Sequence, residues 1–330
     1  MVVPTLRAGP ELLDCVYSLD RQTQTGVEIV VVDNSGCGKV RQSAAARLAH
    51  RVIEHEHNRG FGAAVNTGFR GSRAPYLATI NDDAVAHPQW LERLVQAMES
   101  EAGVGMCASQ IRLANSELLD SAGMLVSGDG ASKQRGQFQS PARYGRCEEV
   151  LLPSACAALY RRAMLEEIGF FDEEFFLYCE DTDLGLRARW AGWKCLYVPE
   201  AVVEHTYSKS AGAASPLKAY YVERNRLFVL LKNYPAGMLW KAPFYTLARY
   251  LWHVLALFGN QGLAAQFQAA GHHPVELVFL AARAHVALLF HLRRLWRQRK
   301  AIRQTARLSS RQFRELLQAH WITPRQVASL

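Results

Sequence analysis

Glu28-Ile-Val-Val-Val-Asp33 is an unbroken apolar run that leads into a turn, Asn34-Ser35-Gly36. A strand without a polar face fits the interior of a parallel sheet that is covered on both sides. Tyr76-Leu-Ala-Thr-Ile80 has the same apolar character and stops at Asn81-Asp82-Asp83. The two runs therefore predict two buried strands, each of which ends at acidic residues.

Helical patterns alternate with strand patterns in this first part of the chain. We expect helices over 10–21, 40–48 and 62–71, and further short strands over 2–3 and 51–56. This alternation predicts an α/β fold with a doubly wound, mostly parallel sheet, in which ligands bind at the carboxyl ends of the strands. Asp33, Asp82 and Asp83 follow such ends, which is the first indication of a functional site.

The second part of the chain begins with a stretch rich in Gly and Ser, residues 109–150, which we expect to meander over the site. Order resumes at Leu151 with a strand that reaches Tyr160. A helix over 181–193 and a strand from Lys194 toward His205 follow. From Pro216 onward the pattern is that of amphipathic helices.

The net charge of +8 is unevenly distributed along the 330 residues. The segment 283–314 contains ten basic residues and no acidic one: Arg283, Arg293, Arg294, Arg297, Arg299, Lys300, Arg303, Arg307, Arg311 and Arg314. The remainder of the chain is close to neutral. We therefore expect an anionic surface as the partner of the C-terminal end.

Cysteine usage and hydropathy indicate the compartment. The seven cysteines are scattered and form no CxxC pair, so we expect thiols of a reducing compartment and no zinc cluster. Met1 to Pro4 runs straight into a strand, which predicts that no signal peptide is present. No uninterrupted apolar run reaches the roughly 20 residues of a membrane span. We expect a cytoplasmic protein that is free in solution or peripheral on the inner face of the cell membrane.

Asp82 and Asp83 directly follow a buried strand, where carboxylates need a partner. Mg²⁺ or Mn²⁺, which takes oxygen ligands and substrate phosphates, is one such partner. The alternative is an N-cap for the helix that follows, since Asp caps helices well. His205 stands at the end of another apolar strand and is either structural or a further ligand beside Asp83.

Glu180-Asp181-Thr182-Asp183 forms a second acidic cluster at the start of a helix. Acidic residues are favoured in a first helical turn, and Asp183 is placed to pair with Arg187 four residues later. The apolar run 175–178 precedes the cluster. Such surroundings raise a carboxylate's pKa and suit Glu180 or Asp181 for work as a general base.

Asn58-Arg59-Gly60 precedes a helix that contains Asn66 in its second turn. A glycine turn that leads into a helix N-terminus suits an anion, and Arg59 adds positive charge. The dinucleotide fingerprint and the Walker lysine motif are both absent, which disfavours NAD binding and a P-loop nucleotidase.

In this order, these motifs resemble the family-two glycosyltransferases of the GT-A fold, and among them bacterial rhamnosyltransferase-type enzymes of cell-surface polysaccharide assembly. The likeness spans about residues 1–235. It rests on 3–5, 32–35, 58–68, 81–84, 169–176, 180–192, 205, 220–226 and 232–235. It implies a catalytic domain over 1–235, with a nucleotide-sugar half over about 1–108 and an acceptor half over about 109–235. A basic helical extension covers 236–330.

The resemblance also implies roles for individual residues. Pro4, Thr5 and Asp33 would hold the nucleotide, and Asn58, Arg59, Gly60 and Asn66 would line the diphosphate pocket together with Asp82. Asp83, with Asp82 and His205, would hold Mn²⁺ or Mg²⁺. Asp181, with Glu180 beside it, would be the catalytic base of an inverting transfer.

The implied donor is a dTDP- or UDP-sugar, with rhamnose as the sugar, and the implied acceptor is a glycan or a polyprenyl-linked sugar. Two alternatives remain open from the residues alone. A sugar nucleotidyltransferase shares the sheet and the acidic metal site, and a nucleic-acid-binding protein would use the basic tail as an arm. The second alternative leaves the acidic motifs unexplained, so we expect no nucleic-acid partner. The tail either lies on an anionic membrane through 283–314 or packs on the catalytic domain.

Overall fold

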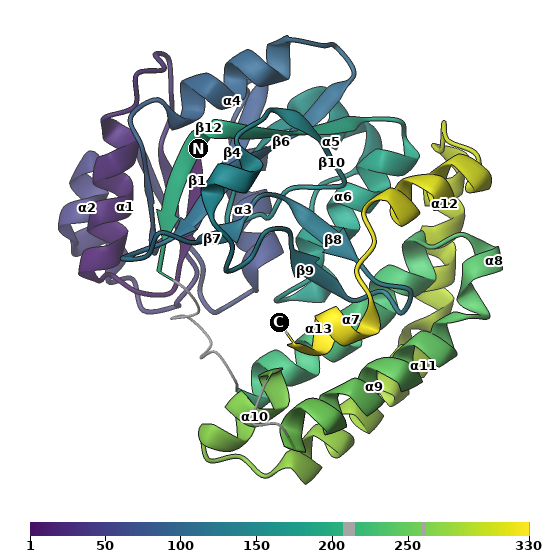
Figure 1. Cartoon of the computed structure of the whole chain (residues 1–330). Helices are drawn as coiled ribbons and strands as arrows, with labels where there is room; N and C mark the ends of the chain where they lie inside the picture. Colours follow the sequence, from purple (N-terminus) through teal and green to yellow (C-terminus); the bar gives the residue numbers. More distant parts are fainter. Residues whose placement is uncertain (207–214, 259–261, 330) are drawn as a thin grey trace. The chain divides into compact units, whose positions relative to one another are not determined.

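The structure is a computed structural model that describes residues 1–206, 215–258 and 262–329 (Figure 1). The chain forms two compact units, which we call the sheet unit and the helical unit. The sheet unit comprises Met1–Gly123, Gln134–Phe176 and Trp193–Tyr207. The helical unit comprises Met124–Lys133, Leu177–Gly192 and Ser208–Leu330. The expected functional division at residue 235 stays a prediction.

The sheet unit is built on a ten-stranded sheet whose main path runs β10-β12-β6-β11-β4-β1-β2-β3. These strands are β1 (Val2–Thr5), β2 (Val30–Asp33), β3 (Arg51–Glu54), β4 (Tyr76–Ile80), β6 (Val104–Leu113), β10 (Glu148–Val150), β11 (Ala157–Arg161) and β12 (Lys194–His205). The strands β4, β1, β2 and β3 are parallel, as the alternation predicted. β11 is antiparallel to both β4 and β6. The short strands β5 (Ala84–Ala86) and β7 (Leu119–Ser121) pair with β12 and β6.

Helices cover both faces of this sheet, which explains the unbroken apolar run in β2. Val3 and Val31 share one buried cluster with Leu12 of α1 (Pro10–Asp20) and Leu94 of α4 (Trp90–Glu99). Val2 points to the opposite face. There Gly68 of α3 (Phe61–Arg70) comes so close that a Cβ atom would lie 2.6 Å from Val2 Cγ1. The α/β class predicted from the sequence is therefore confirmed.

One expectation for the middle of the chain is wrong. Residues 109–113, expected to meander, belong to the ten-residue strand β6, which lies between β11 and β12. Small and polar residues disguise this strand in the sequence. Their polar groups are satisfied inside the protein, because Trp90 Nε1 donates to Ser109 Oγ at 2.8 Å and Gln110 Nε2 donates to Tyr197 Oη at 3.0 Å.

The helical unit contains a set of helices and, except for Gln134, the two-stranded sheet of β8 (Met124–Val126) and β9 (Ser132–Gln134). The helices are α6 (Glu180–Trp190), α7 (Pro216–Asn233), α8 (Ala236–Leu239), α9 (Ala242–Phe258), α10 (Gly262–Ala269), α11 (Pro274–Gln304), α12 (Ser310–Ala319) and α13 (Pro324–Ser329). α7 packs along α11, and α9 packs on α13. The C-terminal helical extension is thus confirmed as helical.

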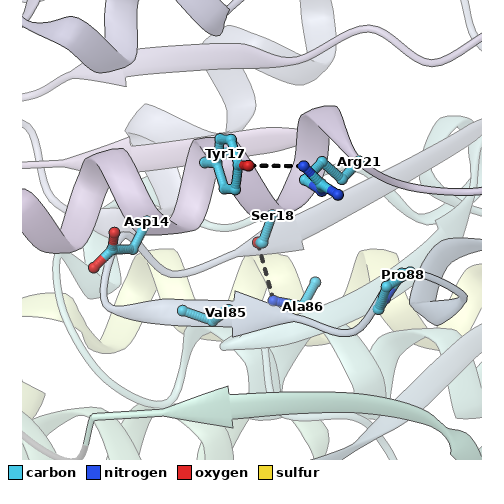
Figure 2. A pocket seen from close by; sticks show the side chains of 7 residues that line it. All are labelled: Asp14, Tyr17, Ser18, Arg21, Val85, Ala86 and Pro88. Carbon is cyan, nitrogen blue, oxygen red and sulfur yellow. Dashed lines mark hydrogen bonds between the residues drawn. The ribbon is translucent and has the colours of Figure 1, made fainter.

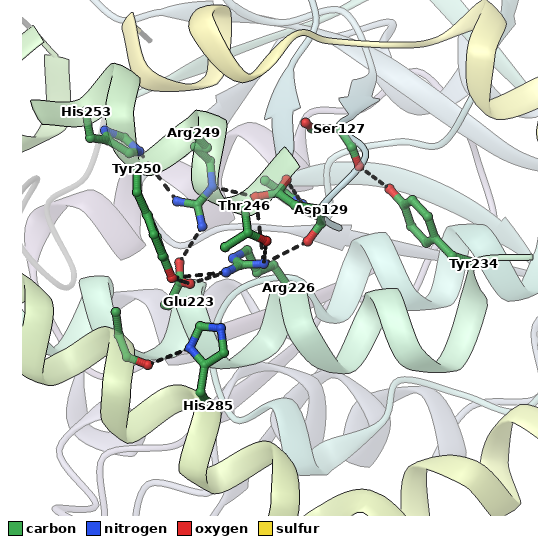
Figure 3. A network of polar contacts seen from close by, with 12 residues as sticks. Ser127, Asp129, Glu223, Arg226, Tyr234, Thr246, Arg249, Tyr250, His253 and His285 are labelled. Atoms are coloured by element: carbon green, nitrogen blue, oxygen red, sulfur yellow. Dashed lines mark hydrogen bonds and ion pairs between the residues drawn. The ribbon is translucent and has the colours of Figure 1, made fainter. Parts of the chain in front are cut away.

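Buried ion pairs tie the helical unit together (Figure 3). Arg226 of α7 pairs with Glu223, and its Nη1 also donates to the carbonyl of Asp129 at 2.9 Å. Arg249 of α9 reaches the same two acids, at 2.6 Å from Asp129 Oδ2 and 2.8 Å from Glu223 Oε2. Two cations and two carboxylates therefore compensate each other where a single unpaired charge would be costly.

α11 bears on the expected absence of a membrane span, which stays a prediction. Among the described residues it is the one helix that is long and apolar enough, by length and composition, to cross a membrane. In the sequence, Glu276 and Arg283 interrupt the apolar run of this helix. Two charges within a continuous helix do not prevent it from reaching that length and average hydropathy.

All seven cysteines are free thiols, as expected.

Asp183 provides a test of these buried pairs. Its fully buried carboxylate accepts from Arg187 Nε at 2.8 Å, as predicted, and from Lys232 Nζ and Asn233 Nδ2 at 2.9 Å each. We expect Asp183→Ala to lower the free energy of unfolding by about 3–5 kcal/mol in denaturant titration, because it leaves buried cations without their acid. The exposed acid Asp20 is the matched control, and a loss for Asp183→Ala no larger than for Asp20→Ala would contradict this account.

Candidate functional site

The ends of β1 and β4 bring two predicted site residues into contact. Thr5 Oγ1 donates a hydrogen bond of 2.6 Å to Asp82 Oδ2. Burial raises the pKa of the Asp82 carboxyl to about 6, against the opposing effect of that hydrogen bond, and the neighbouring charge of Asp83 adds to the rise. Asp82 is thus a poorly solvated carboxylate that a nearby positive charge would stabilise.

His205, at the end of β12, lies between two carboxylates. Its Nε2 is 3.2 Å from Asp83 Oδ1, and its Nδ1 is 2.8 Å from Asp120 Oδ2. Burial opposes the charged imidazole, but Cys156 and these two carboxylates outweigh it and hold the pKa of His205 well above its ordinary value. The sequence analysis missed Asp120, because nothing in the Gly- and Ser-rich stretch distinguishes it from other acids.

Asp33 and Asn34 at the end of β2 organise the adjacent loops. Asp33 Oδ1 accepts from the backbone N of Ser35 at 3.0 Å and from its Oγ at 2.6 Å. Asn34 Nδ2 donates to Asn58 Oδ1 and to the Gly60 carbonyl, at 3.0 and 3.1 Å. The amide of Asn34 therefore joins the end of β2 to the glycine turn that precedes α3.

The turn at Gly60 requires glycine. Its φ is +86°, and a Cβ atom would lie 2.3 Å from the carbonyl oxygen of Phe176. Asn58 Oδ1 accepts from Gly60 N at 2.9 Å, and Arg59 forms an exposed ion pair of 3.4 Å with Glu173. Asn66 is fully buried, and its amide bonds the backbone of Phe171 in both directions, at 2.9 and 3.1 Å. These contacts show a structural role for Asn58, Gly60 and Asn66, and their contact with a ligand stays a prediction.

Glu180 and Asp181 open α6 in the helical unit, after a strained turn. Phe176, Tyr178 and Cys179 all have positive φ, at 62°, 68° and 65°. Non-glycine residues in this conformation cost free energy and persist where the surroundings hold them, often at functional sites. Here Asn225 Nδ2 from α7 donates to the carbonyls of Leu177 and Tyr178, at 2.8 Å each.

The two carboxylates of this motif differ in environment. The Glu180 side chain is buried, and its Oε2 has no hydrogen-bond partner among the residues that the structure describes. Burial, together with the charge of Asp181, raises the pKa of Glu180 to about 8. Asp181 is only half-buried, and its Oδ1 accepts from the backbone N of Thr182 at 2.6 Å. Adjacent carboxyls in unlike environments are suited to unlike roles.

The structure thus gathers Thr5, Asp82, Asp83 and His205 into one cluster of the sheet unit, and adds Asp120. Within the described ranges, no group of three or more His, Cys, Asp or Glu side chains is arranged to hold a metal ion. A surface hollow of about 360 Å³ lies elsewhere in the sheet unit, between α1 and β5 (Figure 2). Its lining contains Asp14, Tyr17 and Arg21 but none of the predicted site residues.

Curated relatives include a Mycobacterium tuberculosis enzyme, N-acetylglucosaminyl-diphospho-decaprenol L-rhamnosyltransferase. The two are 29% identical over 269 residues, which cover 74% of this chain and 86% of that protein. The pre-mycofactocin glycosyltransferase of the same organism is 25% identical over 67% of this chain and 45% of its own length.

Solved structures with the same fold are glycosyltransferases. The mannosyltransferase PcManGT of Pyrobaculum calidifontis, in complex with GDP-Man and Mn²⁺, matches with a TM-score of 0.53 and 18% identity. The match covers 94% of this chain and 85% of that one. GalNAc-T7 with UDP, GalNAc and Mn²⁺ matches with a TM-score of 0.59 and 16% identity, over 76% of this chain and half of that one. These likenesses confirm the predicted GT-A fold.

The family profile described as glycosyl transferase family 2 matches residues 1–169, which include β1, β2, β4 and both acids after β4. That match favours glycosyl transfer over the nucleotidyl transfer and nucleic-acid binding that the residues alone left open. The chain belongs to glycosyl transferase family 2.

Proposed function

We propose that this protein is a metal-dependent, inverting glycosyltransferase that moves a sugar from a nucleoside diphosphate to a glycan or polyprenyl-linked acceptor. The observation that carries the proposal is the cluster at the carboxyl ends of the strands, where Asp83 lies beside His205 and Asp82 beside Thr5. Strand ends of this kind are where open α/β sheets bind their ligands.

The cluster fits a divalent cation that is shared with a diphosphate. Mg²⁺ and Mn²⁺ in such sites need only one or two protein ligands, because phosphate oxygens and water complete the shell. Asp83 and His205 would hold the ion, with Asp82 beside them, and Asp120 would fix the imidazole ring through Nδ1. A divalent ion held by these residues would neutralise the negative charge that develops on the leaving diphosphate.

Asp181 is the proposed base that takes the proton from the acceptor hydroxyl. Glu180, buried and with its pKa raised to about 8, is neutral near pH 7 and does not compete for that proton. Asp181 is the more exposed of the two and is positioned by Thr182. Direct attack by the activated hydroxyl would invert the anomeric centre.

One relative supports the proposed donor and acceptor. The mycobacterial relative is named as a rhamnosyltransferase that acts on a decaprenol-linked sugar. By analogy we propose a dTDP- or UDP-linked donor, with rhamnose as the sugar, and a lipid-linked acceptor.

Thermal-shift measurements with dTDP- and UDP-sugars in the presence of Mn²⁺ would identify the donor by the largest rise in melting temperature.

Asp83→Ala is expected to abolish the part of donor affinity that depends on the metal. Calorimetric titration with the nucleotide should show a gain in affinity on adding Mn²⁺ for the unchanged protein and none for the variant. Asp14→Asn, an acid outside the cluster, serves as the control and should keep that gain. If Asp83→Ala keeps the full gain in nucleotide affinity on adding Mn²⁺, Asp83 is not a metal ligand.

Asp181→Asn is expected to bind the donor normally and to lose about 10²–10⁴-fold in turnover, because the amide cannot accept the proton. Donor affinity is measured by calorimetry and turnover by release of the nucleoside diphosphate. Comparable turnover in the variant would refute the assignment. Proton NMR of the unchanged enzyme's product tests inversion separately, since a retained anomeric configuration rules out a single displacement.

Glu180→Gln tests the buried neutral carboxyl. The pKa of this carboxyl is 4.5 in the unfolded chain and about 8 in the folded chain. Between these pH values the folded chain holds a proton that the unfolded chain has released. The free energy of unfolding therefore falls as the pH rises through this range. Gln cannot ionise, so the stability of Glu180→Gln relative to the unchanged protein should increase from about pH 5 to about pH 8 and then level off. Denaturant titrations across this range measure the difference. A difference that does not vary with pH would show that Glu180 is not neutral in the folded protein.

A further inference from the structure

One face of α11 is divided along its length into an apolar half and a basic half. At 3.6 residues per turn, side chains spaced by three or four residues follow a single stripe. The first part of this stripe is Val275, Phe279, Val286 and Phe290, and all four are exposed, Phe279 to 71% and Phe290 to 83%. The second part continues as Arg293, Arg297 and Lys300, which are exposed as well.

The opposite face of α11 packs against the interior of the helical unit. Ala284, Leu295 and Ile302 are buried there. Two of the tail's arginines also turn inward, because Arg299 Nη1 and Arg303 Nη2 donate to the Tyr234 carbonyl beyond the end of α7, at 2.7 and 3.1 Å. These two arginines therefore cap α7 and are not part of the exposed stripe.

α9 presents a second exposed apolar stripe in the same unit. Phe244, Leu247, Leu251 and Leu255 follow one another at helical spacing and are all more than half exposed. Arg249, on the other side of the helix, is buried in the ion-pair network. α9 contains no acidic residue.

We propose that the helical unit docks on an anionic lipid bilayer through the exposed stripe of α11. The apolar half, about 22 Å from Val275 to Phe290 at 1.5 Å per residue, would enter the boundary between headgroups and acyl chains. Arg293, Arg297 and Lys300 would lie at the level of the lipid phosphates.

Charge complementarity favours an anionic bilayer over a second copy of this chain. Residues 283–314 contain no Asp or Glu, so this segment of a second copy offers no opposite charge to Arg293, Arg297 and Lys300. The inner contacts of α11 favour docking over crossing. A spanning α11 would have to give up its packing on α7 and carry Arg283, now 4.4 Å from the Tyr220 ring, into the hydrocarbon.

Vesicle flotation of the purified full-length chain tests the proposal. Vesicles of phosphatidylcholine alone are compared with vesicles in which one lipid in three is phosphatidylglycerol. We expect the chain to float with the anionic vesicles and to be released by about 0.5 M salt only in part, since apolar contacts are not screened. The measurement needs neither donor nor acceptor, so its outcome is independent of the proposed transferase activity.

Paired variants separate the two halves of the stripe. Phe279→Ser with Phe290→Ser should lower the partition coefficient on anionic vesicles about tenfold or more. Arg293→Gln with Arg297→Gln should lower it about 30-fold, at about fivefold per cation. Arg311→Gln with Arg314→Gln removes the same charge from α12 and is the matched control, which should bind as the unchanged protein does. Circular dichroism and thermal melting verify that every variant is folded.

Three outcomes overturn the proposal. In the first, the partition coefficient on anionic vesicles falls as much for the α12 control as for Arg293→Gln with Arg297→Gln, which indicates a general effect of charge. Another is a dimer in sedimentation analysis that Phe279→Ser with Phe290→Ser converts to a monomer without affecting flotation, which assigns the stripe to a second copy. The third is resistance of the bound chain to alkaline carbonate extraction, which assigns α11 as a membrane span.

Discussion

A polar group that folding removes from water must find a partner inside the protein, and this constraint determines the arrangement of both compact units. In the helical unit, Arg226 and Arg249 enclose two carboxylates. In the sheet unit, His205 bridges Asp83 and Asp120. Although Arg226 and Glu223 are neighbours in α7, each cluster also includes partners that are remote in sequence, so these contacts link segments that local structure alone would leave independent.

The same constraint explains why many residues that carry the family resemblance have structural contacts and no proposed part in the reaction. Asn225 of α7 bonds the carbonyls of the strained turn before Glu180, and Lys232 and Asn233 hold Asp183 one turn further on. None of these three residues needs to touch a substrate. Their contribution is to fix the start of α6 and with it the position of Asp181, the residue that we propose as the base.

The sequence predicted those features whose causes are local. The apolar runs of β2 and β4 and the glycine turn before α3 were recognisable because their patterns depend on neighbouring residues. β6 was missed because Ser109 and Gln110 look like loop residues until Trp90 and Tyr197 supply their hydrogen bonds. Asp120 was missed for the same reason, since its partner His205 is 85 residues away in the chain. The acidic motifs were recognised, but the unlike environments of Glu180 and Asp181 required coordinates.

The division of α11 into an apolar and a basic half has a kinetic consequence. Exposed cations act over a distance of about 8 Å at physiological ionic strength, so they govern how often the chain meets an anionic surface. Apolar side chains act only in contact, so they govern how long it remains there. With the two properties on separate turns of one helix, arrival and residence can be altered independently by substitution. An enzyme whose acceptor is confined to a bilayer would then search for it in two dimensions for a time set by Phe279 and Phe290.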